Sequence, residues 1–271
     1  FILSVFLRKD GYFLASFISI PSLAISYVAS GAHAYLTEGR QKQMLKKAFS
    51  QYLSPDMVNA LIAEPDRLQL GGEKKLMTIM FCDVRGFTSI SEKLKSRPEV
   101  LTDVINTLLT ELSQKILETG GTIDKYMGDC IMAFWNAPVL DPLHAENAVR
   151  AARAMSASVD EINQLIEKRE GENFELKIGI GIATGECVVG NMGSKQRFDY
   201  TVLGDVVNLA SRLEGQTKAY GTTTIICNNT AKTITGETPD IVEVDRIRVK
   251  GKQEPETIFG VFDSALSDED Q

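Results

Sequence analysis

Two aspartates stand where apolar stretches of this sequence end. Asp83 follows the apolar residues 79–82 and is soon followed by Gly86, a pattern that indicates a buried strand ending in a tight turn. Asp129 follows Gly128 between two short apolar stretches, so we expect a hairpin with this carboxylate at its tip. Carboxylates on neighbouring strand ends can hold two divalent ions, which activate an attacking oxygen and stabilise a phosphate during in-line displacement. Each aspartate taken alone is also typical of a turn or a helix cap.

Three other polar side chains could serve the same chemistry. Lys125 lies four residues before Asp129 and could face the same cavity, although a single lysine at a strand end is usually solvated. A helix over residues 205–219 would place Asn208 and Arg212 one turn apart on one face. An amide and a guanidinium in that arrangement can bind one anionic ligand, and the alternative is an exposed polar stripe.

Apolar strands and amphipathic helices alternate from residue 74 onward. We expect helices at residues 98–119, 141–168 and 205–219, and strands at residues 76–82, 122–125, 130–134, 175–183, 186–189, 223–227, 242–249 and 257–262. The β-α-β-β-α-β order at the front predicts an α+β fold with a ferredoxin-like core. The glycines of this region fit no nucleotide-binding motif, so we expect them to permit a tight hairpin; they are Gly179, Gly181, Gly185, Gly190 and Gly193.

The composition is that of a folded protein without a nucleic-acid surface. With 44% hydrophobic and 24% charged residues among 271, the chain can bury one substantial core plus something smaller. The formal charge of −7 leaves no basic stripe to displace counterions, so we expect no nucleic-acid partner. The four scattered cysteines form no C-x-x-C pair and indicate reduced thiols rather than a zinc site or disulfides.

The N-terminal part carries an uncharged stretch of about 26 residues, 11–36, where a membrane crossing needs about 20. We expect residues 1–36 to be membrane-embedded and to form the end of a longer membrane or sensor region. A buried helix of a soluble protein is the alternative. Residues 40–47 carry four lysines or arginines against two at residues 8–9, so the positive-inside rule predicts a cell-membrane protein with a cytoplasmic C-terminal part.

The cytoplasmic part divides into three segments. Residues 37–73 should form a helical stalk, because apolar residues recur at helical spacing over residues 45–53 and could pair with a second copy. The globular domain is expected at residues 74–263, and residues 264–271 form an acidic tail.

Three motifs in this domain resemble the catalytic domain of class III adenylate cyclases. They are F-x-D-V-R-G-F-T at residues 81–88, K-x-x-G-D at 125–129 and T-V-L-G-D-x-V-N-L-A-S-R at 201–212. The motifs occur in the order of that family, and the likeness covers roughly residues 70–263. With the membrane stretch before it, the chain resembles the receptor type of this family.

The resemblance implies two divalent ions, Mg²⁺ or Mn²⁺, as cofactors. Asp83 and Asp129 match the metal-binding aspartates, assisted by the backbone carbonyl of Val84. Asn208 and Arg212 match the pair that acts on the transition state.

The resemblance also implies how the nucleotide is bound. Lys125 and Thr201 match the residues that bind adenine, and Lys250 matches a contact to the terminal phosphates. Many members carry Asp at the position of Thr201, so this chain resembles the Thr-bearing branch, for which bicarbonate stimulation is a possibility. A guanylate cyclase would carry Glu and Cys at the two base-binding positions.

The implied reaction closes ATP into 3′,5′-cyclic AMP and releases pyrophosphate, in active sites shared between the subunits of a homodimer. A catalytically silent ATP-binding signalling module is the alternative. A diguanylate cyclase or polymerase-palm enzyme would share the two-metal chemistry, but it would carry a G-G-D-E-F type of turn at Asp129. A purely structural membrane anchor would leave the acids, the lysine and the arginine unexplained.

Overall fold

The computed structural model describes residues 23–30, 71–171, 174–194, 196, 198–235, 240–248 and 254–262. The chain divides into two compact units, Phe1–Ala63 and Glu64–Gln271. In the first unit, residues 23–30 form a helix with exposed side chains. Among the described residues, no helix combines the length and the apolar character that a membrane crossing requires. The rest of the predicted membrane segment, nearly all of the predicted stalk, Lys250 and the acidic tail lie outside the described residues.

The second unit is built on a β-α-β-β-α-β core. Its elements are β1 (Gly71–Arg85), α5 (Pro98–Glu118), β2 (Thr122–Met127), β3 (Cys130–Trp135), α6 (His144–Glu170) and β4 (Lys177–Gly193). The four strands lie in the order β2-β3-β1-β4, and each neighbouring pair is antiparallel. The ferredoxin-like core that the sequence predicts is therefore confirmed. A short helix after β1, α4 (Phe87–Lys93), was not predicted.

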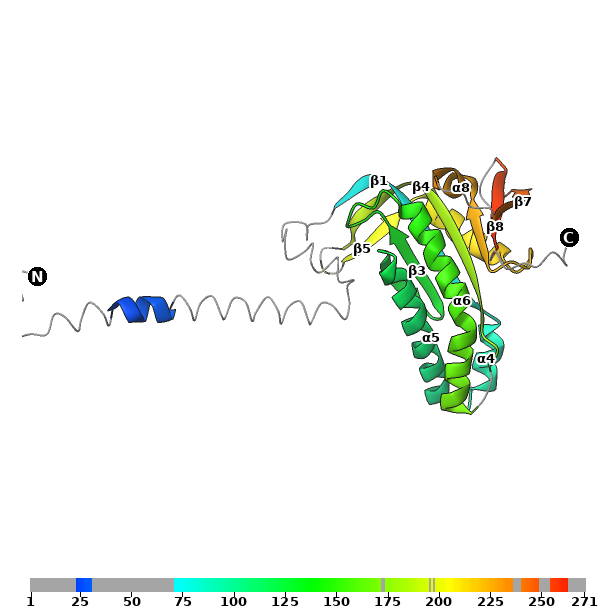
Figure 1. Ribbon diagram of the computed structural model, residues 1–271, viewed down its shortest axis with the longest axis horizontal. Helices are drawn as coiled ribbons and strands as arrows, with labels where there is room; N and C mark the ends of the chain where they lie inside the picture. The colour runs from blue at the N-terminus through cyan, green and yellow to red at the C-terminus, as the bar shows by residue number, and fades with distance from the viewer. Residues whose placement is uncertain are drawn as a thin grey trace, which may run out of the picture. The chain divides into compact units, whose positions relative to one another are not determined.

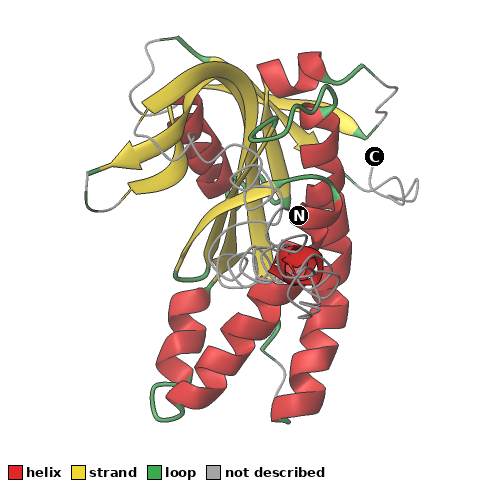
Figure 2. Cartoon of the chain, turned by 90° about the vertical axis from the view of Figure 1, so that its left-hand side faces the viewer, coloured by secondary structure: helices red, strands yellow, loops and turns green. Residues whose placement is uncertain are grey.

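Further strands extend the sheet beyond β4. β6 (Thr224–Cys227) pairs with β4 in parallel, and β8 (Glu256–Val261) and β7 (Ile241–Ile247) follow it. β5 (Phe198–Leu203), which was not predicted, leaves this path and pairs with the C-terminal half of β4. Figure 2 shows how strongly the strands curve. The helices α7 (Asp205–Gln216) and α8 (Asn228–Thr233) complete the described part of the unit.

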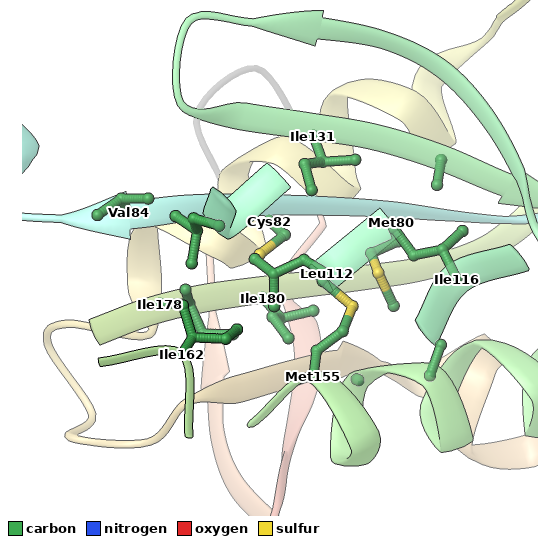
Figure 3. Close-up of a cluster of buried hydrophobic side chains, with 14 of the residues drawn as sticks. Met80, Cys82, Val84, Leu112, Ile116, Ile131, Met155, Ile162, Ile178 and Ile180 are labelled. Atoms are coloured by element: carbon green, nitrogen blue, oxygen red, sulfur yellow. The ribbon is translucent and has the colours of Figure 1, made fainter. Parts of the chain in front are cut away.

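One face of the sheet packs against α5 and α6, which lie side by side (Figure 1). Successive residues of a strand point to opposite faces, so alternate residues of β1 share a face. Met80, Cys82 and Val84 of β1 enter this first core, where Figure 3 shows them gathered with Leu112 and Met155 of the two helices. α5 begins at a proline suited to a first helical turn, and α6 ends at Gly171 in the left-handed conformation with φ +74.

The opposite face of the sheet packs against α7. Ile79 and Phe81 of β1 belong to this second core, together with Leu209 and Leu213 of the helix. Both faces of β1 are thus buried, which is why residues 79–82 form an unbroken apolar run. Asp83 continues the second face and therefore extends on the side of the sheet where α7 lies.

The glycines of β4 do not form the predicted hairpin. β4 is one continuous strand of 17 residues, and the prediction of two strands separated by a turn was wrong. A Cβ on Gly181 would lie 2.1 Å from the backbone nitrogen of Glu214 and 2.2 Å from the carbonyl oxygen of Ala210, both in α7. Glycine is required there because the helix backbone crosses directly over the strand.

Candidate active site

The strand register brings Asp83 and Asp129 together. Cys82 of β1 lies opposite Ile131 of β3, so the next residue of β1 reaches the turn between β2 and β3. That turn is a two-residue hairpin loop whose first residue, Gly128, has φ +69. The predicted hairpin with an acid at its tip is confirmed.

The two carboxyl groups interact directly, and we call them the acid pair. A side-chain hydrogen bond joins Asp129 to Asp83, and the backbone N–H of Val84 donates to Asp129. Burial and then the charge of Asp83 raise the pKa of Asp129 above its ordinary value. Two carboxylates in contact repel each other unless a proton or a cation compensates them, so the acid pair fits a cation site.

The donor set indicates which cations would fit. Among the described residues, no group of three or more His, Cys, Asp or Glu could hold a metal ion. Mg²⁺ is usually bound by one or two carboxylates, with substrate phosphates and water as the other ligands, and the acid pair suits that arrangement. The side chain of Val84 is buried in the first core, so only its backbone could contribute.

Glu214 of α7 lies beside the acid pair, and sequence reasoning missed it. Gly179 of β4 is opposite Asp83, and a Cβ on this glycine would come within 2.8 Å of Oε1 of Glu214. Burial and then the charge of Asp83 raise the pKa of Glu214 to about 7, and Arg85 opposes this shift. Arg85 is itself anchored, because it donates a hydrogen bond to the carbonyl of Thr222. The surroundings of the acid pair are therefore negative, which favours a bound cation.

Lys125 and Thr201 are linked by a residue that sequence reasoning also missed, Asp124. The hydroxyl of Thr201 on β5 donates to Oδ2 of Asp124 over 2.5 Å. Nζ of Lys125 lies 3.3 Å from Oδ1 of the same carboxylate. The structure thus brings together the two residues that the resemblance assigns to adenine. The sequence shows an acid immediately before Lys125, but nothing local in it links that acid to Thr201.

Asn208 and Arg212 lie on α7, which covers most of the helix predicted at residues 205–219. They are one turn apart, while Val206, Leu209 and Leu213 face the second core. Asn208 is exposed and Arg212 is half-buried. Neither side chain makes a hydrogen bond or ion pair with any residue that the structure describes, which leaves both groups available to a ligand.

The site residues form separate groups within one chain. Among the described residues, no hydrogen bond or ion pair joins the acid pair to Lys125 or Thr201. The predicted contact of Lys250 with terminal phosphates lies outside the described residues and stays a prediction.

The cysteines near the acid pair are not suited to nucleophilic chemistry. All four cysteines of the chain are free thiols, and Cys82 and Cys130 lie next to the acid pair. Burial, followed by the charges of Asp83 and Glu214, raises the pKa of Cys130 to about 12. Burial also raises the pKa of Cys82 well above its ordinary value. Thiols held protonated in this way are poor nucleophiles.

Comparison with known proteins gives the family. Residues 72–260 match the family described as the adenylate and guanylate cyclase catalytic domain. The chain is similar to the crystal structure of the adenylyl cyclase CyaB from P. aeruginosa, with 39% identity, a TM-score of 0.65, and coverage of 73% of this chain and 98% of that one. It is also similar to the guanylyl cyclase Cya2, with 34% identity, a TM-score of 0.62 and the same coverage.

Longer relatives share the same region. An adenylate cyclase of Anabaena cylindrica is 32% identical over 248 residues, which make up 89% of this chain and 48% of the relative. Adenylate cyclase 1 of Rhizobium meliloti is 40% identical over 149 residues, or 55% of this chain and 22% of the relative. The chain thus spans about half or less of the length of these two relatives. The resemblance found in the sequence motifs is confirmed, and the chain belongs to the family of adenylate and guanylate cyclase catalytic domains.

Proposed function

We propose that this protein is an adenylate cyclase that converts ATP into 3′,5′-cyclic AMP and pyrophosphate. The direct contact between the carboxyl groups of Asp83 and Asp129 carries this proposal, within a domain of the cyclase family. In the reaction, the ribose 3′-oxygen forms a bond to the α-phosphorus, and the bond from that phosphorus to the bridging oxygen of the β-phosphate breaks. Pyrophosphate is the leaving group, and the proton of the 3′-hydroxyl is released.

Different residues of the chain have different roles in this reaction. Asp83 and Asp129 would hold two divalent ions, which would supply a lower pKa for the 3′-hydroxyl and positive charge beside the α-phosphate. Arg212 stabilises the negative charge that develops on the phosphate, and Asn208 orients the ribose. Preorganised donors of this kind typically lower a barrier by about 2.7–4 kcal/mol each.

The base is proposed to be adenine because of Lys125 and Thr201. The family contains cyclases for both purines, since CyaB is named an adenylyl cyclase and Cya2 a guanylyl cyclase. A lysine ammonium can only donate hydrogen bonds, which suits a ring nitrogen of adenine that accepts one. Thr201 lies beside it and can contact the exocyclic amino group. The Glu and Cys expected of a guanylate cyclase are absent from these two positions.

We also propose that two copies of the chain form each active site together. One copy would supply the acid pair, and the other would supply Lys125, Thr201, Asn208 and Arg212. The lack of any described hydrogen bond or ion pair between the two groups within one chain supports this arrangement. So do the exposed apolar side chains of Tyr126 and Met127 near the hairpin tip, which offer surface to a partner.

Attachment to the cell membrane and control through a helical stalk are proposed on sequence grounds. The uncharged residues 11–36 and the helical pattern of residues 45–53 support this proposal. If the stalk aligns the two catalytic domains, replacing both Ala48 and Phe49 with Glu should uncouple or inactivate the enzyme in membranes. Unchanged turnover would contradict a role for the stalk.

A turnover assay with complementation tests the proposed function. The wild-type chain should form cyclic AMP from ATP, in the presence of Mg²⁺ or Mn²⁺, faster than it forms cyclic GMP from GTP. The Asp83→Ala and Arg212→Ala variants should each be inactive, and their mixture should regain activity because a heterodimer keeps one intact site. A wild type that binds ATP without turnover would indicate a silent signalling module, and failure of the mixture would contradict shared sites.

A further inference from the structure

Asp124 occupies an unusual place in β2. The pairing of β2 with β3 shifts register between Ile123 and Lys125, so Asp124 is the extra residue of a β-bulge. Bulges redirect a side chain that would otherwise follow the alternation of the strand. The side chain of Asp124 is fully buried, whereas that of Lys125 is 42% exposed. The bulge therefore directs a carboxylate inward, directly beside a lysine whose side chain stays partly exposed.

The contacts of this buried carboxylate are few and specific. Oδ2 accepts the hydroxyl proton of Thr201 over 2.5 Å, and Oδ1 lies 3.3 Å from Nζ of Lys125. Oδ1 has no hydrogen bond of good geometry among the described residues. Burial of a carboxylate is unfavourable, and it raises the pKa of Asp124 even though Thr201 and Lys125 oppose the shift. A carboxylate in this position is thus not explained by stability.

The hydrogen bond fixes the role of the Thr201 hydroxyl. A threonine hydroxyl has one proton to donate and two lone pairs that accept. Since the proton is directed to Asp124, the oxygen of Thr201 presents only lone pairs to a bound base. Lone pairs attract the exocyclic amino group of adenine and repel the carbonyl oxygen at the same position of guanine.

We propose that Asp124 is a specificity-determining positioning residue, which makes Thr201 an obligatory hydrogen-bond acceptor and so selects adenine over guanine. Asp124 acts through Thr201 and Lys125 without touching the base. This inference rests on the proposed function, because it takes Lys125 and Thr201 to be the residues that contact the base. It adds Asp124 to Lys125 and Thr201 as a third residue of the base-binding group, with a role that the sequence motifs do not give it.

The substitution Asp124→Asn tests this role with almost no change in shape. Because Lys125 can only donate, the new amide turns its oxygen to Lys125 and its NH₂ group to Thr201. The hydroxyl of Thr201 then accepts from the amide, and its own proton becomes free to meet the carbonyl oxygen of guanine. We expect the ratio of kcat/KM for ATP to that for GTP to fall by about tenfold or more in the full chain, because a good hydrogen bond to adenine is exchanged for an unfavourable contact.

Two further variants separate this role from a general loss of structure. In a Thr201→Val background no hydroxyl remains to be oriented, so adding Asp124→Asn should leave the ratio unchanged. Asp199→Asn is the matched control, because the charge of this exposed β5 residue also raises the pKa of Asp124, but within the described part of the chain it makes no hydrogen bond or ion pair with Thr201. It should leave the ratio as in the wild type.

The outcomes distinguish this inference from the proposed function. A wild type that turns over ATP, combined with Asp124→Asn lowering both kcat/KM values equally, overturns the inference alone. An effect of Asp124→Asn that persists in the Thr201→Val background also overturns it. A wild type that prefers GTP or turns over neither nucleotide overturns the proposed function, and the inference with it.

Discussion

The acid pair and Asp124 hold buried negative charge in opposite ways. Asp83 and Asp129 contact each other, and the third acid of this region, Glu214, adds to their repulsion. Asp124 is more deeply buried, yet a hydroxyl and an ammonium compensate it within the same chain. The first arrangement brings like charges together, whereas the second places a hydroxyl and an ammonium beside the charge before any ligand binds. The residues proposed to bind metal are thus strained, whereas the residues proposed to select the base are preorganised.

The largest expected effect concerns the acid pair. Asp129→Asn should lower turnover by about 10²–10³-fold, because one of the two carboxylates proposed to bind cations is lost. The same change should raise the thermal unfolding temperature of the metal-free protein at pH 7. A carboxyl group whose pKa is raised in the folded state destabilises that state at every pH above its ordinary pKa. The uncharged Asn side chain does not carry this cost.

Turnover and unfolding should be measured on the same samples of Asp129→Asn. Asp160→Asn is the control, because this residue is an exposed carboxylate on α6, far from the acid pair in the sequence and on another element. It should change neither quantity. A variant that loses activity and stability together would contradict the view that the acid pair is strained in the absence of cations.

The next effect tests the dependence of the acid pair on α7. Gly181→Ala places a Cβ 2.1 Å from the helix backbone, and overpacking of this kind typically destabilises a protein by about 1–3 kcal/mol. Because Glu214, Asn208 and Arg212 move with α7, turnover of ATP and GTP should fall by the same factor. The nucleotide ratio should stay unchanged, since Asp124 and Thr201 lie on β2 and β5.

Gly185→Ala is the matched control on the same strand. A Cβ there meets only Val206, at 3.4 Å, which is an ordinary van der Waals contact. Urea unfolding of both variants should show a loss of stability for Gly181→Ala alone. An altered ATP/GTP ratio in Gly181→Ala would show that the base-binding group also depends on α7.

The core of the fold was predictable because its signals are local. The apolar residues 79–82, the Gly128 turn and the proline that opens α5 each indicate an element without reference to distant residues. The glycines of β4 were misinterpreted because their cause lies in another element, the backbone of α7 above Gly181. Glycine marks both turns and close approaches, and the sequence alone does not distinguish the two.

The same distinction between local and distant causes applies to the candidate site. The acids at strand ends and the Asn208 and Arg212 spacing could be predicted from local pattern and resemblance. Asp124 and Glu214 could not be predicted, because the role of each depends on residues that are distant in the sequence. Thr201 lies 77 residues after Asp124, and the strand curvature that brings β5 to β2 leaves no local mark in the sequence.

A smaller effect is expected for the stability of Asp124→Asn. The folded pKa of Asp124 is raised, so between its ordinary value of 3.8 and that raised value the folded state binds more protons than the unfolded state. Stability attributable to this group therefore falls as pH rises through that window. Asp124→Asn should be at least as stable as the wild type at pH 7, and its advantage should vanish near pH 3. A loss of stability at pH 7 would show that the contacts with Lys125 and Thr201 outweigh the burial penalty.

The smallest expected effect concerns the buried His144, whose contribution to stability changes with pH in the opposite direction to that of the acidic residues. His144 is 4% exposed, and its Nδ1 lies 2.7 Å from the hydroxyl oxygen of Thr78. Burial lowers its pKa below 6.5, so the unfolded state binds the extra proton and stability falls as pH drops below that value. The raised pKa values of Asp124, Asp129 and Glu214 act with the opposite sign. Unfolding of His144→Asn between pH 7 and pH 5 should therefore show stability that rises, or falls less, on acidification than that of the wild type; an unchanged slope would mean that His144 does not titrate with folding.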